Sequence, residues 1–163
     1  MALVLVSCGQ QSPQRPSQRK GEKPKADSAA LALLELNQSL AIAADKQLTQ
    51  LALAQEEQYA LYEASTWMTI LDKGDQEGPA PTFNEFWTIH MRTYDLAGHL
   101  LLDSEGTYQI GKQELPLAVE LNIRELHQGG KARLLAPWYA AYGLEGTAEI
   151  PPYENVIIEI ELK

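Results

Sequence analysis

The stretch from Gly129 to Leu162, GGKARLLAPWYAAYGLEGTAEIPPYENVIIEIEL, carries the strongest local signals in the chain. Its first two glycines favour a tight turn, because glycine adopts positive φ angles at little cost. The next residues, Lys131 to Ala136, are a predicted strand that Pro137 stops. Residues 155–162 place an apolar side chain at every second position, which predicts a half-buried antiparallel strand.

Three motifs of this stretch resemble, in order and spacing, the C-terminal half of the FKBP-type peptidyl-prolyl isomerase domain. They are the bend Ala141-Tyr142-Gly143, the corner Ile150-Pro151-Pro152 and the strand Val156 to Leu162. Further upstream, Gly111 to Leu115 (GKQEL) is similar to the segment before the family's single helix, here predicted over Pro116 to Leu126. The resemblance implies an α+β fold: an FKBP-like antiparallel twisted sheet wrapped on one short helix, preceded by an N-terminal helical segment.

Alternating apolar residues predict three more strands before these motifs. They cover Tyr59 to Leu71, with a small turn at Ala64-Ser65, then Phe86 to Tyr94 and His99 to Ser104. A breaker-rich loop separates the first two strands, and Asp95 to Gly98 forms a turn between the last two. We expect the three strands to form a meander.

A helix is predicted from Asp27 or Ser28 to Gln55, with a break near residues 37–39 or 44–45. Its apolar stripe consists of Leu33, Leu36, Leu40, Ala44, Leu48 and Leu51. This stripe either docks on the chain's own domain or forms the seam of a homodimer. We therefore divide the chain into a helical extension, residues 27–57, and an FKBP-like domain, residues 58–163.

The N-terminus resembles that of a bacterial lipoprotein. Leu5-Val6-Ser7-Cys8 matches the lipobox, so that residues 1–8 are a predicted signal remnant and Cys8 the lipidated residue. Residues 9–26 are rich in Gln, Ser, Pro and Lys, a composition typical of a disordered tether. These features predict a lipid-anchored, periplasm-facing protein of the bacterial envelope. The alternatives are a chance cysteine and a soluble spacer.

The lipoprotein start, the helical segment and the meander together give a narrower resemblance, to the gliding-motility-associated FKBP-type lipoproteins of Bacteroidetes. The family's activity implies proline-containing polypeptide clients.

Composition limits the other classes of function. The 163 residues carry a net charge of −9, and five of the 13 basic residues lie in segment 9–26, so the remaining chain is strongly acidic. Such a body argues against nucleic-acid binding. The three histidines have no spacing with cysteine, aspartate or glutamate that suggests a metal site, and we expect no metal or other cofactor.

The family's reaction needs no covalent intermediate. Rotation about a peptide bond must cross a barrier of about 18–20 kcal/mol that amide resonance creates. An apolar pocket helps, because the twisted amide is less polar than the planar one and is easier to desolvate.

The resemblance implies a set of site residues. Asp103 and Tyr142 match the family's catalytic polar residues, and the substrate-binding positions fall on Met91, Leu102, Leu115, Pro116, Val119 and Ile158. Most of these positions are aromatic in the family and aliphatic here, and Pro116 lacks the N–H that the family uses to hold a ligand carbonyl. Tyr142 could instead bond local backbone, and Asp103 could cap a turn. The alternative function is therefore a non-catalytic binding or scaffold module of an envelope complex.

Overall fold

The computed structural model describes residues 28–163, so the predictions for Cys8 and for the tether lie outside the described residues. The helices and turns are α1 (Ser28–Ala54), η1 (Glu63–Ser65), α2 (Leu117–Asn122), η2 (Ile123–Glu125) and η3 (Trp138–Ala140). The strands are β1 (Ala60–Leu61), β2 (Trp67–Asp72), β3 (Phe86–Tyr94), β4 (Leu100–Gln109), β5 (Lys131–Ala136) and β6 (Val156–Leu162).

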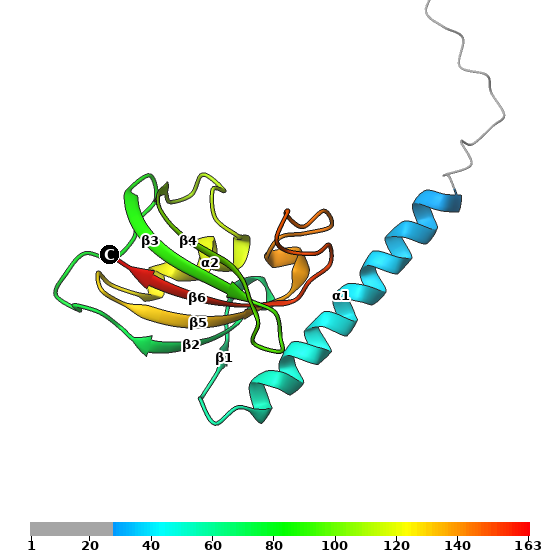
Figure 1. Ribbon diagram of the computed structural model, residues 1–163, viewed down its shortest axis with the longest axis horizontal. Helices are drawn as coiled ribbons and strands as arrows, with labels where there is room; N and C mark the ends of the chain where they lie inside the picture. Colours follow the sequence, from blue (N-terminus) through cyan, green and yellow to red (C-terminus); the bar gives the residue numbers. More distant parts are fainter. Residues whose placement is uncertain (1–27) are drawn as a thin grey trace, which may run out of the picture.

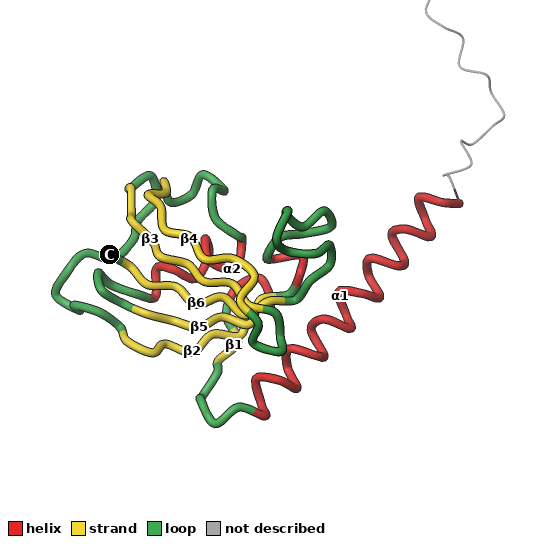
Figure 2. The backbone as a smooth tube through the Cα atoms, in the orientation of Figure 1, coloured by secondary structure: helices red, strands yellow, loops and turns green. Residues whose placement is uncertain are grey.

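Within residues 28–163 the strands form one antiparallel sheet in the order β1-β2-β5-β6-β3-β4 (Figures 1 and 2). The α+β class, the short helix against the sheet and the N-terminal helix are confirmed. The predicted meander is wrong, because β2 pairs with β5 and β3 pairs with β4 and β6. Local alternation identifies strands but not their partners. The long loop after β2 carries the chain past the positions of β5 and β6, so β3 joins the sheet beyond them.

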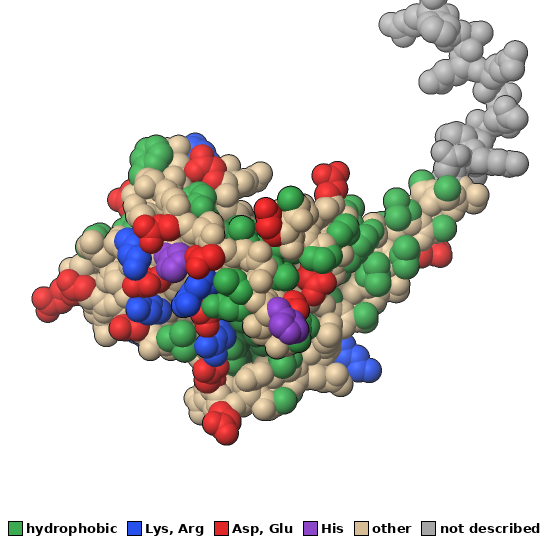
Figure 3. All heavy atoms as spheres, in the orientation of Figure 1, with side chains coloured by type: hydrophobic (Ala, Val, Ile, Leu, Met, Phe, Trp, Pro, Cys, Tyr) green, Lys and Arg blue, Asp and Glu red, His purple; other side chains and the backbone are tan. Residues whose placement is uncertain are grey.

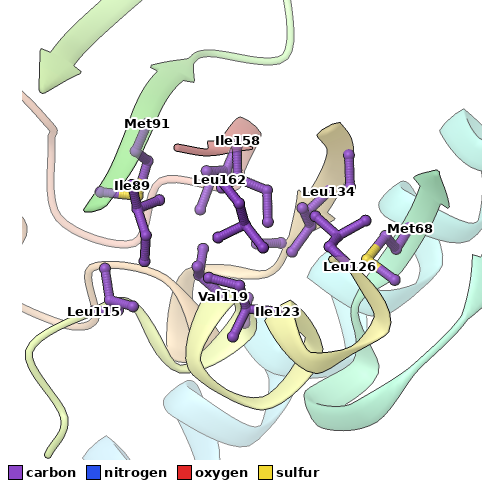
Figure 4. Close-up of a cluster of buried hydrophobic side chains, with 14 of the residues drawn as sticks. Met68, Ile89, Met91, Leu115, Val119, Ile123, Leu126, Leu134, Ile158 and Leu162 are labelled. Atoms are coloured by element: carbon purple, nitrogen blue, oxygen red, sulfur yellow. The ribbon is translucent and has the colours of Figure 1, made fainter. Parts of the chain in front are cut away.

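The core lies between one face of the sheet, here called the inner face, and α2 (Figure 4). Every second residue of β6 is buried on this face: Val156, Ile158, Ile160 and Leu162. Helix α2 places Val119 against them, and Ile123 of η2 continues the contact. Pro116 lies at the N-cap of α2 rather than inside the helix, because its ψ of 139° is extended. The predicted helix is therefore α2 followed by η2.

The opposite, outer face of the sheet changes from apolar to charged along its strands. Leu135 and Ile157 pack with the C-terminal half of α1. Two residue pairs further along β5 and β6, Arg133 donates to Glu159 at 2.8 Å and to Glu57 at 2.8 Å, and Arg92 lies 3.0 Å from Glu159. Figure 3 shows this mixed patch of basic and acidic side chains on the sheet. Glu57 thus ties the segment after α1 to the sheet.

Helix α1 runs unbroken and docks on its own domain with its C-terminal half. Ala44, Leu48 and Ala52 are buried, whereas Leu33 and Leu36 of the predicted stripe are exposed, since the first turns of the helix project away from the domain (Figure 1). The predicted breaks are wrong; at the first of them, the hydroxyl of Ser39 bonds the Leu36 carbonyl, which a continuous helix allows. Among residues 28–163, no helix is long and apolar enough to cross a membrane.

Truncation of the Leu48 side chain tests whether the packing of α1 on the domain stabilises the protein, because this change removes buried contacts and leaves the helix propensity high. We expect Leu48→Ala to lower the free energy of unfolding by about 2–5 kcal/mol, because it leaves a cavity under α1. Leu53→Ala, at an exposed position of the same helix, should change it by less than about 0.5 kcal/mol. Urea denaturation measures both variants, and equal effects would contradict docking in solution.

Candidate functional site

Four of the predicted substrate-binding residues form an apolar floor on the inner face of the sheet. Met91 comes from β3, Leu115 from the segment before α2, Val119 from α2 and Ile158 from β6, and the four converge in Figure 4. Each is at most 6% exposed. The floor is therefore part of the hydrophobic core, and its position is fixed by the packing of the sheet on α2.

Tyr142 lies at the rim of this floor. It follows η3 and precedes Gly143, whose φ of +75° turns the chain into the flap loop. Its ring packs against the core cluster, and its hydroxyl lies 2.9 Å from the hydroxyl of Thr93, a fully buried residue on β3. The predicted alternative, a bond from Tyr142 to local backbone, is not what the structure shows.

The protonation of Tyr142 suits a hydrogen-bond donor. Burial raises the pKa of Tyr142 above its ordinary value, while the hydrogen bond with Thr93 acts in the opposite direction. The phenol is consequently neutral at physiological pH and keeps its proton. If Thr93 donates to the Tyr142 oxygen, that proton is available to a ligand carbonyl.

Asp103 lies on the other side of the sheet from Tyr142. It pairs with Arg92 in the β3–β4 register, and its carboxylate lies 2.7 Å from Nε2 of His90, an outer-face residue. Leu102 and Asp103 are adjacent in a strand, so their side chains point to opposite faces. Leu102 packs against the core cluster on the inner face, which leaves Asp103 outside. Asp103 and Tyr142 therefore lie on opposite faces of the sheet, although the resemblance implies that both act in one site.

The inner face of β4 presents three residues that are not among the predicted site residues. Ser104, Gly106 and Tyr108 follow Leu102 at every second position. The oxygen of Ser104 is buried and has no hydrogen-bond partner among residues 28–163. The ring of Tyr108 covers Gly106, where a Cβ atom would lie 3.1 Å from the tyrosine Cζ and hydroxyl oxygen. The period of two from Leu102 onward was the signal that could have identified them.

Pro116 lies at the edge of the site, where α2 begins. Its carbonyl accepts hydrogen bonds from the N–H groups of Val119 and Glu120, both at 2.9 Å. Pro116 itself has no N–H, so this position offers no backbone donor to a ligand. The polar side-chain groups next to Tyr142 and on the inner face of β4 are hydroxyls.

The flap that carries Tyr142 is supported from outside the site by α1. Tyr139 donates to Asp45, and Tyr153 donates to Asn37 at 3.0 Å, both acceptors belonging to α1. Trp138 lies between the two tyrosines, with ring centroids 5.4 Å from Tyr139 and 4.9 Å from Tyr153. The helix thus restricts the motion of the segment next to the rim.

These groups can hold an apolar ring over a rigid floor and donate hydrogen bonds to the carbonyls beside it. Within the described part of the chain, no three side chains of His, Cys, Asp or Glu gather in a way that could hold a metal ion. The chemistry that this geometry offers is the binding of an apolar ring, with hydrogen bonds from hydroxyl groups to the carbonyls beside it.

Comparisons with known proteins agree with this geometry. The family model of FKBP-type peptidyl-prolyl cis-trans isomerase matches residues 82–163, half of the chain. A comparison with curated proteins gave no match. None of the matches supports the narrower resemblance to gliding-motility lipoproteins.

Two solved structures share the fold. A peptidyl-prolyl cis-trans isomerase from Pseudomonas syringae pv. tomato superposes with a TM-score of 0.63 at 23% identity, over 76% of this chain and 92% of that one. FkpA from Escherichia coli gives a TM-score of 0.63 at 19% identity, over 83% of this chain but only 63% of FkpA. Since its C-terminal half matches the family model and its fold agrees, the chain belongs to the family of FKBP-type peptidyl-prolyl cis-trans isomerases.

Proposed function

We propose that this protein is a peptidyl-prolyl cis-trans isomerase or folding factor of the bacterial envelope, which acts on proline-containing polypeptides. The observation that carries the proposal is the Tyr142 hydroxyl held by Thr93 at the rim of a buried apolar floor. The floor excludes water from a bound proline, and the hydroxyl orients a neighbouring carbonyl.

Catalysis at such a site needs preferential binding of the twisted amide. The twisted state has lost resonance and carries less charge separation than the planar amide, so an apolar floor disfavours it less. Each 1.4 kcal/mol of preferential stabilisation accelerates the exchange about tenfold. The rim hydroxyls add directional contacts without requiring a proton transfer.

We expect Tyr142→Phe to lower the catalysed cis/trans exchange rate of a short Xaa-Pro peptide about 2- to 10-fold. The reason is the loss of one hydrogen bond, which typically contributes about 0.5–1.5 kcal/mol. NMR exchange spectroscopy on blocked tetrapeptides measures the rate with and without the protein.

Two outer-face variants are matched controls for this measurement. Tyr94→Phe removes a tyrosine hydroxyl that bonds Glu159, and Asp103→Ala removes a carboxylate that bonds His90. Both should leave the exchange rate within about twofold, since Tyr94 and Asp103 face away from the floor. A large loss in Asp103→Ala together with no loss in Tyr142→Phe would invert our assignment of the site.

A non-catalytic binding or scaffold module is the second candidate function. It is favoured by Pro116, which cannot donate to a ligand, and by the aliphatic floor, which offers little stacking surface. Peptide binding without accelerated exchange in the same NMR experiment would identify this function.

The lipid anchor at Cys8 and the envelope location are part of the proposal, motivated by the lipobox and the tether composition. Expressed behind a complete export signal, the protein should partition into the detergent phase, and Cys8→Ala should move it to the aqueous phase. A wild type that stays aqueous would end the anchoring proposal. The narrower likeness to gliding-motility lipoproteins depends on the same features.

The N-terminal half of α1 supports a homodimer. Leu31, Leu33, Leu34 and Leu36 are each at least 50% exposed on the part of the helix that projects from the domain. If these residues pair with a second copy, Leu31→Glu with Leu34→Glu should convert a dimer into a monomer in sedimentation equilibrium. A monomeric wild type at high micromolar concentration would exclude the dimer.

A further inference from the structure

Ser104 carries a buried hydroxyl that lies beside the floor. The proposed mechanism does not use this hydroxyl. Ser104 pairs directly with Met91 across the β3–β4 ladder, and paired residues share one face of a sheet. The neighbouring pair on this face is Thr93 and Leu102, so Ser104 and Thr93 are diagonal neighbours whose Cβ atoms lie somewhat less than roughly 7–8 Å apart. Its oxygen has no partner among residues 28–163. A buried hydroxyl without a partner costs free energy, which a hydrogen bond to a ligand carbonyl would recover.

Tyr108 supplies an aromatic surface at the same rim. Its ring lies over Gly106, with atoms 3.1–3.2 Å from the position that a Cβ atom of residue 106 would take. The space that a side chain at Gly106 would occupy is therefore filled by the ring of Tyr108. Tyr108 packs against the core cluster but is only partly buried. Burial is the largest cause that raises the pKa of Tyr142, and the charge interaction with Tyr108 raises it further. This agrees with both rings bordering the same space.

Other aromatic side chains near the floor are already engaged. Trp87 is 8% exposed, and its indole N–H donates to Glu85. Trp138 packs between Tyr139 and Tyr153 on the side of α1. Phe83 covers Gly111 and lies near Lys112. Four partly buried tyrosines pack against the core cluster: Tyr62, Tyr108, Tyr139 and Tyr142. Tyr139 is bonded to Asp45, and Tyr62 lies next to η1, whereas Tyr108 is on the inner face of β4 and Tyr142 bonds Thr93 of β3.

We propose that the inner face of β4 contacts the substrate through two side chains. The ring of Tyr108 forms the wall against which the proline ring packs, and the hydroxyl of Ser104 donates a hydrogen bond to a carbonyl of the bound Xaa-Pro peptide. Tyr142 contacts the peptide from the flap side. This inference rests on the proposed function and assigns to Ser104 and Tyr108 the contacts that Asp103 cannot make from the outer face.

The test uses the full chain and one probe, the blocked tetrapeptide Ala-Leu-Pro-Phe. Intermolecular nuclear Overhauser contacts should connect the proline ring protons of the peptide with the ring of Tyr108 in the wild type. Tyr108→Leu should raise the Kd of the peptide roughly 2- to 10-fold, because the aromatic face is lost, whereas Tyr108→Phe should stay within about twofold. Ser104→Ala should raise the Kd by a similar factor.

Thermal unfolding of each variant distinguishes lost contacts from lost structure, and Asp103→Ala serves as the control with an unchanged Kd. If the wild type binds the peptide and accelerates its exchange but Tyr108→Leu and Ser104→Ala behave as wild type, this inference is overturned and the proposed function survives. If the wild type neither binds the peptide nor accelerates its exchange, the proposed function and this inference fall together.

Discussion

The structure depends on one packing contact, that between the alternating apolar residues of β6 and the short helix α2. Strand β6 lies inside the sheet, between β5 and β3, and its inward side chains are buried on Val119 and Ile123. The outward residues Glu159 and Glu161 form ion pairs with basic residues of β3, β5 and the C-terminus. A register slip of one residue would bury these carboxylates, so the alternation fixes the sheet.

The same alternation decides which residues can meet a substrate. The candidate site is built on the inner face, and its floor is the core itself, so the floor has little freedom to adapt. The hydrogen-bonding side chains around the floor are those of Thr93, Ser104, Tyr108 and Tyr142, which all carry hydroxyl groups. A site of this kind positions its donors through strand geometry, and Asp103 is excluded for the same geometric reason.

Helix α1 connects the outer face with the flap. Its buried residues pack on Leu135 and Ile157, while Asn37 and Asp45 accept hydrogen bonds from the tyrosines that flank Trp138. Tyr142 follows this segment directly, so the docking of α1 and the position of the rim are mechanically related. The first turns of the helix expose Leu31, Leu33, Leu34 and Leu36 to solvent and supply the surface for the proposed homodimer.

The sequence by itself determined the family, most strand and helix positions and four residues of the floor, although it ended the strand β4 at Ser104 instead of Gln109. These follow from local signals, because alternation, prolines and glycines act over a few residues, and Met91, Leu115, Val119 and Ile158 are apolar residues at core positions of such elements. It could not determine that β2 pairs with β5, because strand pairing depends on contacts between distant segments. The tertiary structure alone decided that Asp103 lies on the outer face of the sheet and that Tyr108 covers Gly106, since the face to which a side chain points follows from the register across two strands rather than from its neighbours in the chain.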